Sequence, residues 1–269
     1  MGVRSLTPSL TRKRFIRKFM SDNSLKSKIS GTETKVLVLV PCYQEEDNIG
    51  RVAGGSVSLG YNTLVVDDGS KDRTSEAARA TGATVIRHEV NRGKGHAVAT
   101  GLQHALDRGF DVVIILDGDG QHLTSEISRF VDEFNRTHSD LILGTRMSNT
   151  KDMPFVRRQT NRLMSWLLSR QIGHRVSDTQ CGFRLISKTA IPVALQCTSV
   201  GFSAESEILL QLALAGHSIS EVGISTVYGN EKSKICPVRD TLRFIKMLLH
   251  FRQQRRELKR NGKLQSLRQ

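Results

Sequence analysis

The stretch VVIILDGDGQH, residues 112–122, decides the fold of this chain. Five consecutive apolar residues, mostly β-branched, are typical of a strand that is buried on both faces, as in a parallel sheet. Directly after such a strand, Asp117 and Asp119 can reach one hard cation together, with Gln121 as a third oxygen ligand. A solvated turn explains Asp-Gly-Asp taken alone. Its position after VVIIL, and a second pair of carboxylates two strands away, favour the cation site.

Further short apolar runs alternate with segments of helical periodicity. Buried strands are predicted at residues 35–40, 63–66, 84–87 and 141–143. The clearest helix between them is residues 97–107, where apolar side chains recur every three to four positions. This alternation predicts an α/β domain with a mostly parallel central sheet. After residue 150 the alternation stops, and we expect helices at 155–172, 203–214 and 239 to about 260, and a strand at 219–222.

Ligands of such sheets bind at the carboxyl ends of the strands, and polar residues follow several of the predicted strands. The second strand leads into Asp67-Asp68, of which we expect Asp68 to bind a ligand while Asp67 caps a turn or faces water. The strand at 141–143 leads into Arg146. Lys94 lies between glycines at the start of a predicted helix, where it can contact a phosphate or a base. Carboxylates and cations are thus predicted to gather at one edge of the sheet.

The formal net charge of +14 is unevenly distributed along the 269 residues. Residues 1–35 carry +7 and residues 239–269 carry +8, so residues 36–238 carry −1. We therefore divide the chain into a basic tail at 1–34, a near-neutral globular domain at 35–238 and a basic amphipathic helix at 239–269. The charge of the tails favours an anionic partner, either a membrane surface or a nucleic acid.

The apolar pattern of the tails favours the membrane. Phe15, Ile16 and Phe19 share one face of a predicted helix whose other face is basic, as in helices that lie on an anionic leaflet. The second tail has a similar pattern, although packing of residues 242–251 on the globular domain explains it equally well. No apolar run approaches the roughly 18 residues of a membrane span, and a secretory signal is not expected. Four widely spaced cysteines fit reduced thiols in a cytoplasmic protein, which we expect to be held peripherally on the cytoplasmic face of a membrane.

Six motifs occur in an order and spacing that resemble those of the inverting family 2 glycosyltransferases of GT-A fold. They are VLVLVPCYQEEDNI, VVDDGSKDRT, NRGKGHA, LDGDGQH, GTR and SDTQCGFR. The resemblance covers residues 35 to about 250 and points to the branch of dolichyl-phosphate mannose synthase and its bacterial polyprenyl-phosphate relatives. It implies a single GT-A (Rossmann-like) domain that transfers a hexose from a GDP- or UDP-hexose to a polyprenyl (dolichyl or undecaprenyl) phosphate at the membrane surface.

The resemblance also implies roles for particular residues. Together with Lys94, those that hold the nucleotide sugar are Pro41, Tyr43, Glu45, Asp68, Asp117 and Lys234. Those that bind Mg²⁺ or Mn²⁺ with the diphosphate are Asp117, Asp119 and Gln121. Arg146 is implied to bind phosphates. A more loosely aligned segment with Arg157 and Arg158 is implied to bind the phosphate of the lipid acceptor. The chain departs from the eukaryotic synthases at Tyr228, where they have an arginine.

Two mechanisms diverge at Glu205. A lipid phosphate is largely ionised at pH 7 and needs cations rather than a base. A hydroxyl acceptor needs a general base, for which Glu205 is the candidate; a carboxylate that favours the start of a helix explains the same residue. The candidate catalytic residues are therefore Asp119, Arg146 and Glu205. A third hypothesis is an inactive fold whose tails bind nucleic acid, but the intact set of Asp117, Asp119 and Gln121 argues against it. A membrane-protein partner for the tails stays open.

Overall fold

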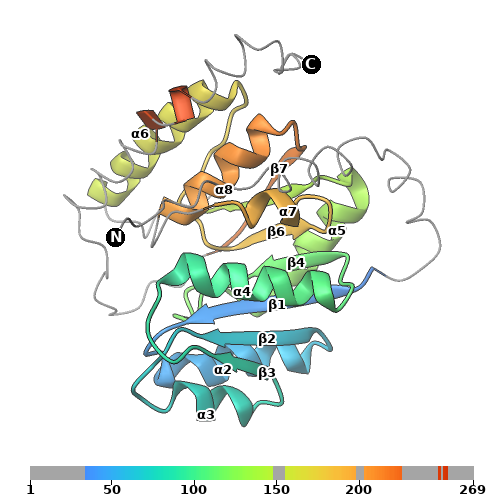
Figure 1. Ribbon diagram of the computed structural model, residues 1–269. Helices are drawn as coiled ribbons and strands as arrows, with labels where there is room; N and C mark the ends of the chain where they lie inside the picture. Colours follow the sequence, from blue (N-terminus) through green and yellow to red (C-terminus); the bar gives the residue numbers. More distant parts are fainter. Residues whose placement is uncertain (1–33, 148–154, 198–202, 226–247, 250, 254–269) are drawn as a thin grey trace, which may run out of the picture. The chain divides into compact units, whose positions relative to one another are not determined.

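The computed structural model describes residues 34–147, 155–197, 203–225, 248–249 and 251–253. From Lys35 onward they form one α/β unit (Figure 1). The strands are β1 (Val36–Cys42), β2 (Asn62–Asp67), β3 (Thr84–Arg87), β4 (Val112–Ile115), β5 (Leu141–Thr145), β6 (Arg184–Ser187) and β7 (Ile219–Gly223).

The sheet is mostly parallel, as predicted. Its strands lie in the order β3-β2-β1-β4-β6-β5-β7 (Figure 1). Only β6 runs antiparallel to its neighbours β4 and β5. The six strands that the sequence predicts are confirmed, whereas β6 was not predicted. This strand has four residues, begins at a charged residue and ends at a polar one, so neither alternation nor a long apolar run indicates it.

Helices cover both faces of the sheet. They are α2 (Glu46–Ser58), α3 (Thr74–Arg79), α4 (Lys94–Asp107), the 3₁₀ helix η2 (Thr124–Glu126), α5 (Ile127–Thr137), α6 (Phe155–Ile172), α7 (Ile191–Ala194) and α8 (Ser203–Leu214). The predicted helices at 97–107, 155–172 and 203–214 are confirmed as α4, α6 and α8. The short helices α3 and α7 and the helices α2 and α5 were not predicted by residue range.

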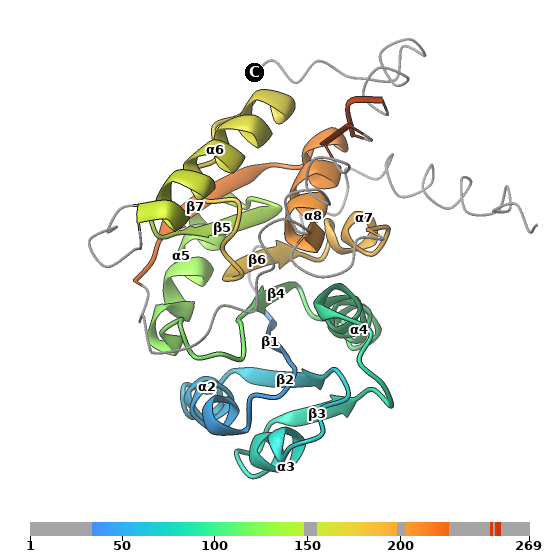
Figure 2. The same cartoon turned by 90° about the vertical axis from the view of Figure 1, so that its left-hand side faces the viewer.

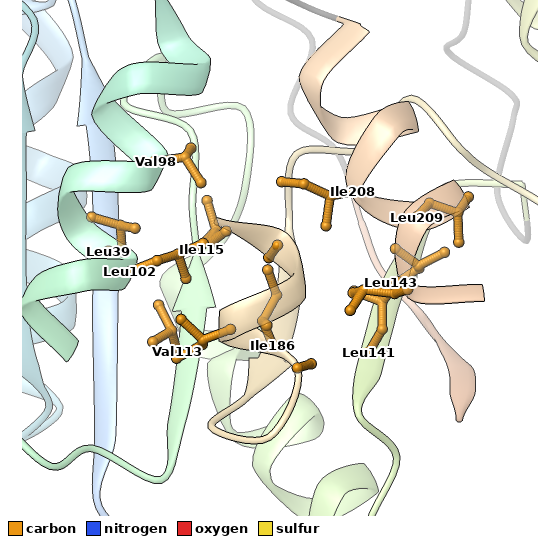
Figure 3. Packing of buried hydrophobic residues seen from close by; sticks show 14 of the residues in the cluster. Leu39, Val98, Leu102, Val113, Ile115, Leu141, Leu143, Ile186, Ile208 and Leu209 are labelled. Carbon is orange, nitrogen blue, oxygen red and sulfur yellow. The ribbon is translucent and has the colours of Figure 1, made fainter. Parts of the chain in front are cut away.

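The core has two layers because successive strand residues point to opposite faces of the sheet. Along β1, Leu37 and Leu39 pack with α4, α6, α7 and α8, whereas Val38 and Val40 pack with α2, α3 and α5. Figure 3 shows the first layer, in which Val98 and Leu102 of α4 lie over the sheet beside side chains of β1 and β4. Full burial of each such aliphatic side chain stabilises the fold by about 1.5–3 kcal/mol.

The described part of the last segment packs on this core. Residues 248–249 and 251–253 are helical, and Leu248 and Phe251 are buried in the first core layer. These two side chains therefore pack in the core rather than on a surface that contacts lipid. The rest of this tail and residues 1–33 of the first tail lie outside the described residues. Among the described residues, no helix is long and apolar enough to cross a bilayer.

A buried carboxylate joins the strands at the edge opposite to the carboxyl ends of β4 and β5. Asp140 accepts hydrogen bonds from the hydroxyls of Ser187 at 3.0 Å, Thr189 at 2.6 Å and Ser218 at 3.1 Å, and its Oδ2 lies 3.1 Å from His217 Nδ1. Burial alone would raise the pKa of Asp140, but these partners hold it well below its ordinary value of 3.8. The ionised carboxylate thus fastens β5 to β6 and β7.

Replacement of Asp140 by Asn is expected to lower the free energy of unfolding at pH 7 by about 2–3 kcal/mol, because several hydrogen bonds to a buried charge are lost. A carboxyl whose pKa is depressed on folding stabilises the fold above its ordinary pKa and loses that contribution as the pH falls through the folded pKa. The difference between variant and wild type should therefore shrink below about pH 4 in urea unfolding. Asp107→Asn, at an exposed carboxylate of α4, is the matched control, and an equal loss for both variants would contradict this role.

Candidate active site

The carboxyl ends of β1, β2, β4 and β5 lie at one edge of the sheet, as predicted, because these strands are parallel in direction. The backbone N of Asp68 donates to the carbonyl oxygen of Cys42 at 2.9 Å, which joins the ends of β2 and β1. Gly118, after β4, lies so close to Cys42 that a Cβ on the glycine would come within 2.9 Å of the cysteine Cβ. The turn that carries the paired aspartates therefore lies directly against the end of β1.

Lys94 joins two carboxylates at this edge. It is the first residue of α4, and its Nζ lies 2.5 Å from Asp117 Oδ1 and 2.5 Å from Glu205 Oε1. Burial alone would lower the pKa of Lys94, but the two carboxylates raise it above its usual value. Burial would likewise raise the pKa of Asp117, whereas Lys94 holds it below its usual value. Lys94 and Asp117 are therefore both charged at neutral pH.

Asp68 fixes the loop that precedes α4. Its carboxylate accepts hydrogen bonds from the backbone N of Arg92 at 3.0 Å and of Gly93 at 2.6 Å, and lies 2.7 Å from His88 Nδ1. Only 2% of Asp68 is exposed. Asp67 is buried and caps the turn that follows it, one of the two roles expected for it. The contacts of Asp68 lie within the protein, and its role toward a ligand stays a prediction.

Asp119 and Gln121 are half-buried in the turn after β4. The backbone N of Gln121 donates to Asp119 Oδ1 at 3.0 Å, and the guanidinium of Arg51 donates to the carbonyl oxygen of Gly120 at 3.3 Å. With Asp117 they offer only oxygen ligands, which Mg²⁺ and Mn²⁺ prefer. The described residues contain no group of three or more His, Cys, Asp or Glu that could hold a metal. A cation bound by these oxygens could also be bound by oxygens of a ligand such as a diphosphate.

Arg146, at the end of β5, forms a two-point ion pair with Asp178. Its Nε lies 2.7 Å from Oδ2 and its Nη2 lies 2.9 Å from Oδ1 of that carboxylate. Asn161 of α6 donates to the same carboxylate at 2.9 Å. Burial would raise the pKa of Asp178, but Arg146 and Asn161 hold it below its usual value. The guanidinium thus ties β5 to the loop before β6, and its role toward phosphates stays a prediction.

The first loop contains the residues expected to hold the nucleotide. Pro41 is buried at the end of β1, Tyr43 is half-buried, and the backbone N of Glu45 donates to Thr74 Oγ1 at 2.9 Å. Between the last two, Gln44 adopts a φ of 55°, which is uncommon for a residue other than glycine. The backbone N of Gln44 donates to Ser70 Oγ at 2.9 Å, which fixes the start of α2 beside the loop after β2. This constrained turn is consistent with a loop shaped for a ligand.

The predicted acceptor residues are described only in part. Arg158 is half-buried in α6. Arg157 lies in the same helix, but its side chain lies outside the described residues, as does the whole of Lys234. Which of these cations lie together therefore stays a prediction.

Sequence reasoning assigned no individual role to Asp178, Gly182 or Arg184 of the SDTQCGFR motif. Gly182 lies against Asp117, since a Cβ on the glycine would clash with the carboxylate of that aspartate. Arg184 is fully buried and donates to the backbone carbonyl of Glu205 at 3.0 Å. The available signal was Arg184, which stands between Phe183 and Leu185, because a charge among apolar residues needs a buried partner.

These features define an α/β fold of the GT-A class with a carboxylate-rich site at the ends of its parallel strands. The fold resembles solved structures of glucosyl-3-phosphoglycerate synthase from Mycobacterium tuberculosis. The complex of that enzyme with uridine diphosphate has a TM-score of 0.61 and 19% sequence identity, covering 92% of this chain and 86% of that one. A complex with Mn²⁺, UDP-glucose and phosphoglyceric acid has a TM-score of 0.59 at 19% identity, covering 87% and 82%.

Residues 37–192 match the model of glycosyl transferase family 2. The chain belongs to this family and is a glycosyltransferase, as the motifs predicted. An uncharacterized protein of Methanocaldococcus jannaschii is 34% identical over 72% of this chain and 82% of its own length. The UDP-N-acetylglucosamine–dolichyl-phosphate N-acetylglucosaminyltransferase of Methanococcus voltae is 29% identical over 72% and 86%. The undecaprenyl-phosphate 4-deoxy-4-formamido-L-arabinose transferase of Edwardsiella ictaluri is 33% identical over 60% and 52%.

Proposed function

We propose that this glycosyltransferase transfers a hexose from a GDP- or UDP-hexose to a polyprenyl phosphate, with inversion at the anomeric carbon and with Mg²⁺ or Mn²⁺. The observation that carries the proposal is the charged site built by Lys94, Asp117 and Glu205 beside Asp119. Two similar proteins, from Methanococcus voltae and Edwardsiella ictaluri, bear names that specify dolichyl-phosphate and undecaprenyl-phosphate, which supports the lipid acceptor.

On the donor side, the loop after β1 and Lys94 would hold the nucleotide, while Asp117, Asp119 and Gln121 would hold the cation. The cation, when bound, acts as a Lewis acid that neutralises charge on the departing diphosphate. Lys94 keeps Asp117 ionised before any cation is present. Its two ion pairs also place the start of α4 beside the turn after β4.

On the acceptor side, a phosphate monoester would be held by cations and would attack the anomeric carbon directly. Its second pKa is near 6, so that it is already largely ionised at pH 7 and needs no general base. Arg146, Arg157 and Arg158 are the proposed partners of this phosphate, and Lys234 is a proposed partner of the donor. We place the enzyme peripherally on the cytoplasmic face of a membrane, where the lipid phosphate and the nucleotide sugar would meet.

A second candidate function is transfer to a hydroxyl group with Glu205 as general base. One observation favours it: Glu205 lies in the first turn of α8, and its Oε1 is 2.5 Å from Lys94 Nζ in the site. In addition, the fold resembles an enzyme crystallised with phosphoglyceric acid. Both functions use the same donor site, so that only the acceptor and the base differ.

Replacement of Glu205 by Gln separates the two functions. With a lipid phosphate as acceptor, we expect kcat to fall less than about tenfold, whereas the loss of a general base for a hydroxyl acceptor costs roughly 10²–10⁴-fold. The measurement is transfer from a panel of nucleotide sugars, with Mg²⁺ or Mn²⁺, to a polyprenyl phosphate and to a set of alcohols. Glu207→Gln, two residues further along α8, is the matched control. Tight, salt-sensitive RNA binding with no binding of any nucleotide sugar would contradict both functions.

A further inference from the structure

Helix α6 has an unusual composition for a helix on the surface of a near-neutral domain. Its 18 residues, FVRRQTNRLMSWLLSRQI, contain four arginines and no acidic residue. One side of the helix is buried, since Leu168 and Ile172 belong to the first core layer. Figure 2 shows α6 at the end of the molecule that carries β5 and β7, away from α2 and α3.

The outward face of α6 combines large apolar side chains with arginines. Leu163 is 58% exposed and Trp166 is 56% exposed, and both are among the most exposed large apolar residues that the structure describes. Arg162 and Arg170, also exposed, lie one turn before and one turn after Trp166 on the same stripe of the helix. The guanidinium of Arg170 lies over the Trp166 ring at 5.8 Å from its centroid. We call these four residues the α6 face.

This combination matches an anionic bilayer surface better than a protein partner. Tryptophan favours the interface between headgroups and acyl chains, where its apolar ring and polar N–H are both accommodated. Arginines place their apolar stems on the same surface and their charges among anionic headgroups. Each partner in a stable protein interface contributes roughly 20–30 residues, many more than the two apolar side chains and the flanking arginines of the α6 face.

The buried side of the same helix contacts the candidate acceptor site. Asn161 donates to Asp178 at 2.9 Å, and that carboxylate holds Arg146. One turn further, Ser165 Oγ lies 3.3 Å from Thr179 Oγ1. The α6 face and the candidate acceptor residues are therefore on opposite sides of one helix, about the 10 Å thickness of a helix apart.

We infer that the α6 face docks on an anionic lipid bilayer and thereby presents the acceptor site to lipid phosphates in that bilayer. The inference deepens the proposed function, since it assumes a lipid acceptor. It differs from attachment through the basic tails alone, because it places a described surface of the catalytic domain against the headgroups.

Trp166 makes the test direct, because it is the single tryptophan of the chain. The full-length protein is mixed with vesicles of neutral lipid, or of neutral lipid plus phosphatidylglycerol, without donor or acceptor. With the anionic vesicles we expect a blue shift of the tryptophan emission, quenching by lipids brominated on their acyl chains, and protection from acrylamide. Vesicle binding that leaves the emission unchanged would overturn the inference, since the tails alone would then be the attachment. An emission change that depends on protein concentration without lipid would overturn it in favour of a second copy.

Variants test the contribution of the face to binding. The double variant Leu163→Ser/Trp166→Ser and the charge reversal Arg170→Glu should each weaken binding to anionic vesicles about tenfold in a sedimentation assay. Leu59→Ser, at an exposed leucine after α2, and Arg79→Glu, at an exposed arginine of α3, are the matched controls at the other end of the sheet. Equal binding by all variants and wild type would overturn the inference.

A second readout separates this inference from the proposed function. The double variant should transfer sugar normally to a short-chain, water-soluble prenyl phosphate but poorly to a long-chain polyprenyl phosphate in vesicles. Normal transfer to both acceptors would overturn the α6 inference and leave the proposed function intact. Absence of transfer to either acceptor by the wild-type enzyme would contradict the proposed function, whereas the fluorescence result would still decide whether the α6 face contacts lipid.

Discussion

Replacement of Asp119 by Ala is expected to lower kcat/KM for sugar transfer about a thousandfold, because charge stabilisation by a bound cation is worth several kcal/mol. Asp119 lies in the turn after β4 with its Oδ1 hydrogen-bonded to the backbone of Gln121, so the variant should keep the fold. The measurement is transfer of a labelled sugar over a range of Mg²⁺ or Mn²⁺ concentrations, together with the melting temperature.

Asp132→Ala provides the matched control, since it removes an exposed carboxylate from α5 without touching the site. It should leave both activity and melting temperature unchanged. If Asp119→Ala melts like the wild type and still transfers sugar at the wild-type rate, the role of the Asp117–Gln121 turn in metal-assisted transfer is wrong.

Replacement of Lys94 by Met should have the largest effect on the stability of the site. It leaves Asp117 and Glu205 without the cation that lies between them. Removal of one partner from a buried ion pair lowers the free energy of unfolding by roughly 3–5 kcal/mol. Because Lys94 is partly exposed, we expect a loss of about 2 kcal/mol. Asp117 has a depressed pKa, so its pairing with Lys94 stabilises the fold above the ordinary carboxyl range and the contribution is lost as the pH falls. The difference in unfolding free energy should therefore shrink between pH 7 and about pH 3.

A double-mutant cycle shows whether the loss comes from the carboxylates. Lys94→Met/Glu205→Gln should recover part of the stability that Lys94→Met loses, because one of the two facing charges is removed. Lys188→Met, at an exposed lysine, is the matched control for the loss of a positive charge. Strictly additive losses in the cycle would show that Lys94 and Glu205 do not interact in solution.

The sheet was predictable because its central strands are short apolar runs followed by polar turns. VVIIL predicted that the carboxylates after it lie at the carboxyl edge of the sheet, and the structure has them there. The strand β6 was not predictable in the same way, since it inserts antiparallel between β4 and β5 and so breaks the regular alternation of strand and helix. Its position depends on long-range pairing with two strands, which no local pattern of four residues contains.

Residue types at the site were predictable, but their partners were not. Lys94, Asp117 and Glu205 were each singled out with separate roles, whereas the structure joins them in one network. The segments that carry them are separated by more than twenty residues in each case. Likewise, Arg146 was expected to meet phosphates, and only the fold shows that its guanidinium meets Asp178.

Contacts between residues before β5 and residues after α6 limit how this enzyme could be recombined with its relatives. Lys94 and Asp117 belong to the segment before β5, whereas Gly182 and Glu205 belong to the segment after α6, and all four meet at one point. An exchange of the second half between family members would replace the residue that lies against Asp117 and one of the two partners of Lys94. Chimeras made in this way would therefore have to keep Gly182 and Glu205 of this chain together with its Lys94 and Asp117.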